Sequence, residues 1–190
     1  ETFLLKGLEL EPLSPFYNVV VCQHYYYDKR WTDAVKFCDQ SMQIEPGYFL
    51  AMKRFTWIYA MQNRYDLLAR NDFGINSIDE MRRNRLTRPL ADGDVNAYWQ
   101  GNLEDRLANK GKRSSPTAIA SYYAMLGDSE KALDLLEEAE RIDSDQLRFL
   151  YADPIWDSLR RELRYKELIQ KIGLGDGRFE EESKRSTKLQ

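Results

Sequence analysis

Residues able to carry out chemistry are scarce in this chain. The sequence contains two cysteines, Cys22 and Cys38, and a single histidine, His24. Two cysteines are too few for a disulfide scaffold or a tetrahedral zinc site. With no second histidine to share a metal or a proton relay, His24 is expected to be a packed or half-exposed helix residue.

Other patterns that could carry catalysis or bind a metal are incomplete. Asp92, Asp94 and Asn96 match the first three ligands of an EF-hand calcium loop. The positions that require glycine and glutamate hold Ala97 and Leu103 instead, which rules the loop out. The sequence also has no Ser/His/Asp grouping, glycine-rich phosphate loop or distinct acid pair. We therefore predict a protein that is not an enzyme and uses no cofactor and no metal.

The composition favours a folded binding protein. The 190 residues include 28 basic and 31 acidic side chains, a net charge of −3, and 43% are hydrophobic. This chain lacks the excess of cations that nucleic-acid binding needs, so we expect no direct nucleic-acid contact. No apolar run approaches the ~18 residues of a membrane-spanning helix, so no span is predicted within this sequence.

Apolar residues recur at helical spacing along most of the chain. The clearest stripe consists of Ala132, Leu135, Leu136, Ala139 and Ile142. The opposite face of this segment is charged, which is typical of an amphipathic helix. Because proline, glycine and β-branched runs are also rare, the sequence predicts an all-α protein.

Turn-like positions recur at regular intervals. They are separated by 34, 30 and 34 residues and comprise Lys29, Asn63, Gly93 and Gly127. In a helical chain, a period near 34 indicates stacked helix–turn–helix units. Small residues allow the paired helices to approach closely (Ala34, Ala132, Ala139), and aromatic residues fill the space between units (Tyr25, Tyr59, Tyr123).

On these residues the chain resembles the tetratricopeptide repeat (TPR) family over roughly residues 1–145. The resemblance implies a right-handed superhelix (solenoid) of antiparallel helix pairs with a C-terminal capping helix segment. Asp153 is the expected N-cap of that segment and Gly173 its helix-stop glycine. Because the chain starts on half a repeat, we expect it to be a fragment of a longer protein.

The predicted boundaries follow the repeat. Residues 1–12 are the second half of a truncated repeat, and 13–46, 47–76 and 113–145 are TPR-like repeats. Residues 77–112 are a degenerate repeat or a connection, 146–175 are capping helices, and 176–190 are a flexible tail.

The resemblance places a partner-binding groove on the first helix of each unit. The candidate binding residues are Gln23, Tyr26, Tyr27, Lys53, Trp57 and Ser121. The further inward positions are Phe16, Val19, Leu50, Met61, Thr117 and Met125. An aromatic wall beside a lysine suits an extended peptide or a partner helix. The alternative is that the large aromatics only pack between repeats.

Two charge runs and the cysteine pair complete the candidates. A possible electrostatic patch consists of Arg82, Arg83, Arg85 and Arg88, and residues 128–145 carry a local charge of −6. Either run could guide a partner or hold two copies together. Cys22 and Cys38 lie on opposing helices of one unit, where a redox pair is conceivable. Without CxxC spacing, we predict buried free thiols.

The expected function is therefore non-catalytic binding of a peptide or partner protein. The end of the chain is similar to the C-terminal TPR region of bacterial signalling and transcription-regulatory proteins, which implies a sensory or scaffolding part of such a protein. Structural self-association as a homodimer is the alternative. The expected location is the cytoplasm, or the periplasm if a membrane span lies upstream.

Overall fold

The computed structural model describes residues 2–70, 88–108, 115–142 and 145–174, and these residues form helices and turns without any strand. The predicted all-α class is confirmed. The chain divides into two compact units, residues 1–102 (unit 1) and 103–190 (unit 2). The helix α7 (Val95–Ala108) crosses the boundary between them.

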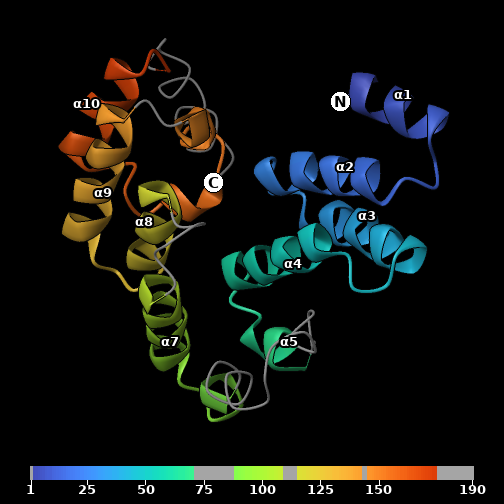
Figure 1. The fold of residues 1–190 in the computed structure, drawn as a ribbon, viewed down its shortest axis with the longest axis horizontal. Coiled ribbons are helices and arrows are strands. Elements are labelled where there is room, and N and C mark those ends of the chain that lie inside the picture. The colour runs from blue at the N-terminus through green and yellow to red at the C-terminus, as the bar shows by residue number, and fades with distance from the viewer. Residues whose placement is uncertain (1, 71–87, 109–114, 143–144, 175–190) are drawn as a thin grey trace, which may run out of the picture. The chain divides into compact units, whose positions relative to one another are not determined.

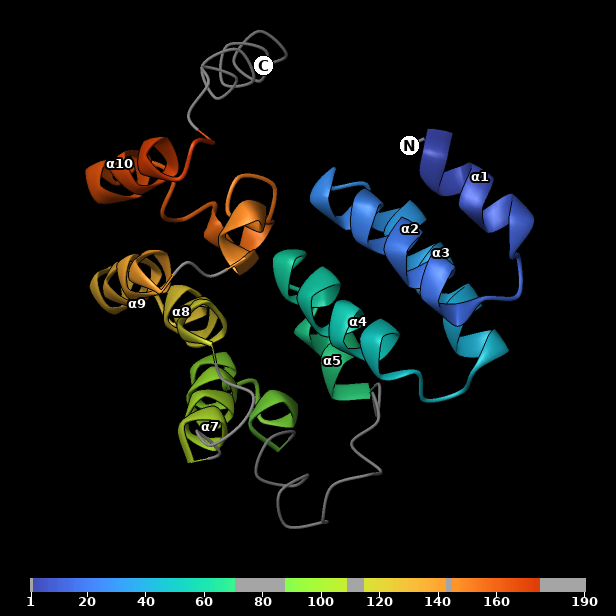
Figure 2. The ribbon, with the colours of Figure 1, turned by 45° about the horizontal axis from the view of Figure 1, so that its top comes forward.

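Unit 1 is built from successive helices that pack on their neighbours. They are α1 (Thr2–Leu10), α2 (Pro15–Tyr27), α3 (Trp31–Ile44), α4 (Phe49–Met61), α5 (Tyr65–Arg70) and the start of α7. The most extensive packing is between α2 and α3, and α2 also contacts α1 and α4. Figures 1 and 2 show α1 to α4 side by side, so α2 lies among three other helices.

Unit 2 centres on a second helix pair. It comprises the end of α7, then α8 (Pro116–Met125), α9 (Ser129–Arg141), the 3₁₀ turns η2 (Asp145–Phe149) and η3 (Pro154–Trp156), and α10 (Leu163–Lys171). The helix α8 packs on α9, η3 contacts α8, and α9 also contacts α10 and η2 (Figure 1). The C-terminal elements therefore cover the α8–α9 pair.

Serine–proline and aspartate caps determine where several helices begin. The Ser14 hydroxyl accepts the Tyr17 N–H (3.3 Å) and the Ser115 hydroxyl accepts the Ala118 N–H (3.2 Å). In both helices proline follows the cap, where its missing N–H costs nothing. Asp153 caps η3 by accepting the Ile155 N–H (3.1 Å), as predicted.

The four predicted turn positions share one backbone conformation. The left-handed residues and their φ angles are Lys29 (57°), Asn63 (56°), Gly93 (78°) and Gly127 (77°). At each turn the next N–H donates to a carbonyl five residues earlier, for example from Arg30 to Tyr25 (2.9 Å) and from Asp128 to Tyr123 (3.0 Å). This is the Schellman helix ending. Gly173 ends α10 in the same way, with a φ of 76°.

The prediction of free thiols was wrong, because Cys22 and Cys38 form a disulfide between α2 and α3. The turn at Lys29 brings the two helices back alongside each other, with the Cα atoms 5.5 Å apart. Both cysteines are completely buried. The bond therefore depends on the packing of two helices and not on a short spacing of the cysteines in the sequence.

Candidate interaction surface

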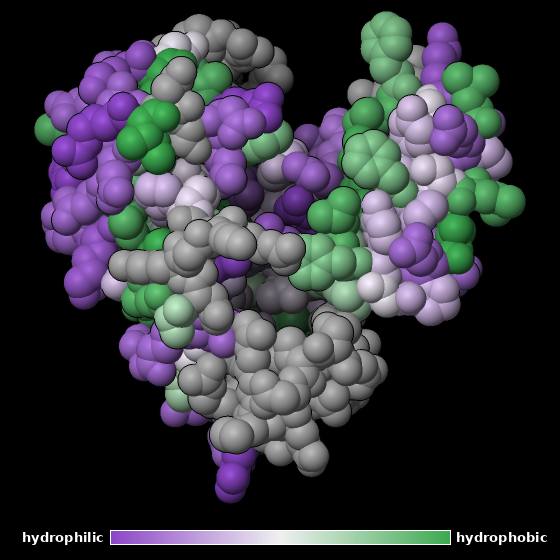
Figure 3. Space-filling view, viewed as in Figure 1, coloured by the Kyte–Doolittle hydropathy of each residue, from purple (hydrophilic) through white to green (hydrophobic). Residues whose placement is uncertain are grey.

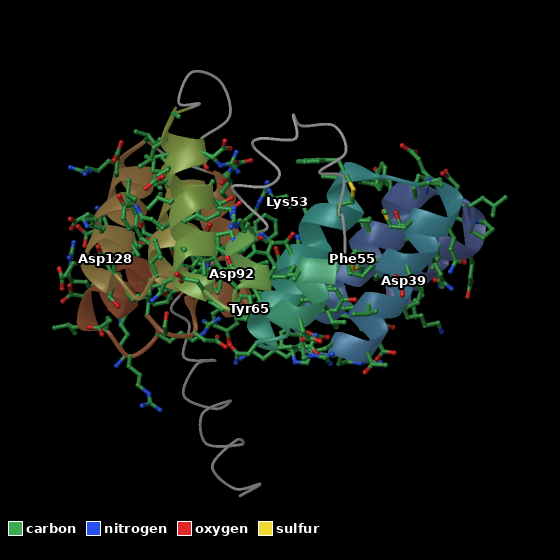
Figure 4. The ribbon with its side chains drawn as sticks, turned by 90° about the horizontal axis from the view of Figure 1, so that it is seen from below. Asp39, Lys53, Phe55, Tyr65, Asp92 and Asp128 are labelled. Carbon is green, nitrogen blue, oxygen red and sulfur yellow. A yellow bond between two sulfur atoms is a disulfide. The ribbon has the colours of Figure 1, made fainter. Side chains whose placement is uncertain are left out.

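The helices α2 and α4 each expose large apolar side chains. The exposed fractions are 52% for Phe16 on α2, and 67% and 40% for Phe49 and Leu50 on α4. Lys53 lies one helical turn after Phe49 and is also exposed (Figure 4). These residues stay outside because α2 and α4 bury their other sides against α3 and each other. We call Phe16, Gln23, Tyr27, Phe49, Leu50 and Lys53 the α2–α4 face.

Polar and aromatic groups are held in place along this face. The Gln23 amide donates to the Tyr27 hydroxyl (2.6 Å), and both side chains are partly exposed. The guanidinium of Arg54 lies over the rings of Tyr26 (4.7 Å) and Tyr27 (5.7 Å). This cation–π arrangement joins α4 to α2 and orients Tyr27.

The two helices contribute no carboxylates to this face. Neither α2 nor α4 contains an aspartate or a glutamate, whereas α4 contributes Lys53 and Arg54. His24, on α2, lies 3.5 Å from Asp28, which follows the helix, and its side chain is 25% exposed. The face can therefore attract an acidic ligand without repulsion from carboxylates on its own two helices.

Two of the predicted groove aromatics lie in the core. Tyr26 is completely buried and contacts Trp31 edge-on. Trp57 is only 8% exposed and stacks on Trp99 with the ring centroids 5.4 Å apart. The indole N–H of Trp99 donates to the Tyr65 hydroxyl (3.3 Å). The packing alternative therefore describes Tyr26 and Trp57 better than a contact role does.

The structure describes only two of the remaining candidate residues, Ser121 and Arg88. Ser121 belongs to unit 2, where its buried hydroxyl donates to the Ala118 carbonyl (2.8 Å). Arg82, Arg83 and Arg85 lie outside the described residues. Arg88 is exposed, with its guanidinium 3.8 Å from the Asp92 carboxylate.

The acidic run of residues 128–145 is engaged in ion pairs within unit 2. Arg164 on α10 contacts Glu130 (2.9 Å), Asp134 (2.7 Å) and Glu137 (2.9 Å) on α9. Hydrogen bonds to Glu137 and then Asp134 raise the pKa of the Arg164 guanidinium. Lys171 similarly reaches Glu140 (2.7 Å). These acids therefore join α9 to α10, a role that the sequence pattern did not reveal.

Sequence analysis did not single out Phe49, although it named the next residue, Leu50. Phe49 is the first residue of α4 and precedes the inward helical stripe, so the repeat pattern gave it no role. The one signal was its spacing, because Phe49 lies four residues before Lys53 and so falls on the same side of a helix.

Metal and membrane features are missing from the part of the chain that the structure describes. Among these residues, no group of three or more His, Cys, Asp or Glu side chains is placed to hold a metal ion. Within the same ranges, no helix combines the length and the apolarity needed to cross a bilayer.

Comparisons with known proteins identify no relative. No protein-family model matches the chain, and neither the curated proteins nor the solved structures give a match.

Proposed function

We propose that this chain is a non-catalytic, TPR-like interaction module, and that the α2–α4 face of unit 1 binds a peptide or a partner protein. Its role would be sensory or scaffolding, within a larger bacterial regulatory or signalling protein. The observation that carries the proposal is the exposure of Phe16 on α2, and of Phe49, Leu50 and Lys53 on α4, on two helices that pack together and contain no carboxylates.

The repeated turn supports the stacking of helix pairs. The same Schellman ending recurs at the four turns whose sequence spacing is near 34 residues. In unit 1, α2 contacts both its own partner α3 and the first helix of the next pair, α4. A stack of helix pairs needs both contacts, since each pair buries its apolar faces against the next.

The chemistry of the α2–α4 face favours a ligand that is both apolar and acidic. Exposed phenylalanine and leucine side chains supply apolar contact area, on which binding energy concentrates. A surface that carries cations and no anions on its helices selects acidic over basic ligands. The hydrogen bond between Gln23 and Tyr27 limits the entropy that these side chains lose on binding.

The test is peptide selection on the full chain followed by variants. Displayed peptide libraries that combine apolar residues with either acidic or basic ones are selected, and recovered peptides are titrated by fluorescence anisotropy. We expect apolar-acidic sequences to be enriched. Leu50→Ala should weaken their binding about 5- to 10-fold, the loss of an apolar anchor. Lys53→Glu should weaken acidic peptides more than neutral ones.

Matched variants away from the face serve as controls. Lys36→Glu makes the same charge change on α3, and Leu163→Ala makes the same truncation at an exposed residue of unit 2. Both should bind like the unmodified chain. Equal losses in the controls, or selection of neither peptide class, would reject this face as the binding site.

Self-association is a second candidate, favoured by the exposure of α1. Phe3 and Leu10 on this helix are 88% and 84% exposed, which is unusual for large apolar residues. Sedimentation velocity at several concentrations should then show a dimer that Phe3→Ser weakens. A monomer at every concentration would exclude this candidate.

A further inference from the structure

The disulfide has no counterpart in unit 2, although the two helix pairs are built in the same way. Cys22 lies seven residues before the turn residue Lys29, and Cys38 lies nine residues after it. Measured from Gly127, the same positions hold Ala120 on α8 and Leu136 on α9. Both are completely buried. The α8–α9 pair thus has a buried alanine and a buried leucine at the positions where the α2–α3 pair has its disulfide.

Burial determines when the bond can form. Neither cysteine has any exposed surface in the folded unit. Around them, Ser41 on α3 donates its hydroxyl to the Pro15 carbonyl at the start of α2 (3.0 Å), which adds a second link between the helices. An oxidant therefore reaches the thiols before α2 and α3 pack, and a reductant reaches the sulfurs only after the pair opens.

We propose that Cys22 and Cys38 are a site of oxidative maturation for a disulfide-bonded oxidant of the thiol–disulfide exchange class. In the reaction one cysteine thiolate attacks the disulfide of the oxidant, which gives a mixed disulfide and releases one thiol of the oxidant; the second cysteine thiolate then attacks the mixed disulfide, forms the Cys22–Cys38 bond and releases the other thiol of the oxidant. The two thiols lose two protons and two electrons in total, and the oxidant is reduced to its dithiol. The chain accordingly matures in a compartment that oxidises thiols, which favours the periplasmic over the cytoplasmic expectation.

This proposal does not rest on the α2–α4 face as a binding site. It predicts a difference between the two units, because the chain has no cysteine outside unit 1. Closing a loop with a sequence separation of 16 shifts the unfolding equilibrium about 100-fold toward the folded state. Reduction should remove that factor from unit 1 and leave unit 2 unchanged.

The first experiment counts thiols in the full chain. The reduced, denatured protein is refolded with glutathione disulfide, and free thiols are titrated in denaturant. We expect no free thiols in the refolded protein and two free thiols per chain after it is reduced. The folded oxidised protein should also keep its bond in millimolar reductant until denaturant is added. Two free thiols in the folded, glutathione-treated chain would overturn the proposal, and so would rapid reduction without denaturant.

The second experiment compares hydrogen exchange in the two helix pairs. Reduction should speed the slowest amides of α2 and α3 by up to about 100-fold and leave those of α8 and α9 unchanged. The double variant Cys22→Ala/Cys38→Leu copies the pair at the same positions of unit 2. It should fold and exchange identically with and without reductant. Equal acceleration in both helix pairs, or a reductant effect in the double variant, would contradict a specific role for the bond.

Discussion

Units 1 and 2 share the same helix–turn–helix geometry and stabilise it by different chemistry. In unit 1, a disulfide joins α2 to α3, and stacked indoles of Trp57 and Trp99 join α4 to α7. In unit 2, small and aliphatic side chains fill the α8–α9 contact, and Arg164 joins α10 to three acids of α9. The same backbone turn therefore forms the helix pair in both units, and the side-chain contacts that stabilise the pair differ between them.

This difference also separates the two surfaces. Four acids of α9 form ion pairs with Arg164 or Lys171 on α10, so much of the strongest charge run of the sequence already has a partner within unit 2. Unit 1 stabilises its helix pairs without carboxylates on α2 and α4 and leaves apolar residues exposed there. On the side shown in Figure 3, the surface over α9 and α10 is mostly hydrophilic, whereas hydrophobic residues appear over the first helices. A binding face is therefore better supported in unit 1.

The largest expected effect is the loss of the indole stack in unit 1. Trp57→Ala should destabilise unit 1 by about 3–5 kcal/mol, because it leaves a cavity against Trp99. Urea unfolding measures the loss, and hydrogen exchange should locate it in α4 and α5. The exposed neighbour Leu50→Ala should change stability by less than about 0.5 kcal/mol. If the Trp57→Ala variant is as stable as the unmodified chain, Trp57 does not stabilise the core and is again a candidate for partner contact.

The next effect compares the turns of the two units. Gly127→Ala should destabilise unit 2 by about 1 kcal/mol, since an alanine at a φ of 77° is strained. A Cβ atom there meets no other atom within 4 Å, so the cost comes from the backbone alone. Lys29→Gly should instead stabilise unit 1, because a non-glycine residue there already adopts the left-handed conformation. Thermal unfolding of both variants checks the two signs, and equal signs would show that the turns are not equivalent.

A smaller effect is expected at the ion cluster of unit 2. Arg164→Gln should cost about 0.5 kcal/mol, because the side chain and its three partners are partly exposed to solvent. The difference in unfolding free energy between this variant and the unmodified chain should become smaller in 1 M salt. Arg148→Gln, which removes a single exposed pair with Asp145, is the control and should have almost no effect. A salt-independent loss would mean that Arg164 acts mainly through packing.

The smallest effect concerns acid stability. Hydrogen bonds from the Lys131 ammonium and then its backbone N–H lower the pKa of the Asp128 carboxyl below its ordinary value of 3.8. The stabilisation from this carboxylate is present above that value and is lost as the pH falls through the lower pKa of the folded state. Asp128→Asn keeps a good N-cap but cannot titrate. Acid unfolding of α8–α9 should therefore be slightly less steep in this variant, and an unchanged profile would contradict the assignment.

The local structure was predictable because short-range physics decides it. The turns at Lys29, Asn63, Gly93 and Gly127 followed from spacing, and all four adopt the left-handed conformation. The N-cap at Asp153 followed from its proline neighbour. Helix periodicity and caps act within a few residues, so they can be read along the chain.

The candidate site was only partly predictable because burial depends on neighbouring helices. The predicted stripe included Gln23, Tyr27 and Lys53, which are at least partly exposed. The same stripe included Tyr26 and Trp57, which are buried. A helical stripe in the sequence shows which side of the helix a residue occupies only to within about one residue position. A shift of one position is enough to move a side chain from the groove into the core.

Amino-acid order by itself determined that this chain forms helices, where they turn back and where several of them begin. Tertiary packing alone decided that Cys22 and Cys38 meet, that Arg164 gathers the acids of α9 and that Trp57 stacks on Trp99. Each of these contacts joins residues on different helices, 16 to 42 positions apart. Which side chains meet at that separation depends on the angle and register of the packed helices, and no local pattern contains that information.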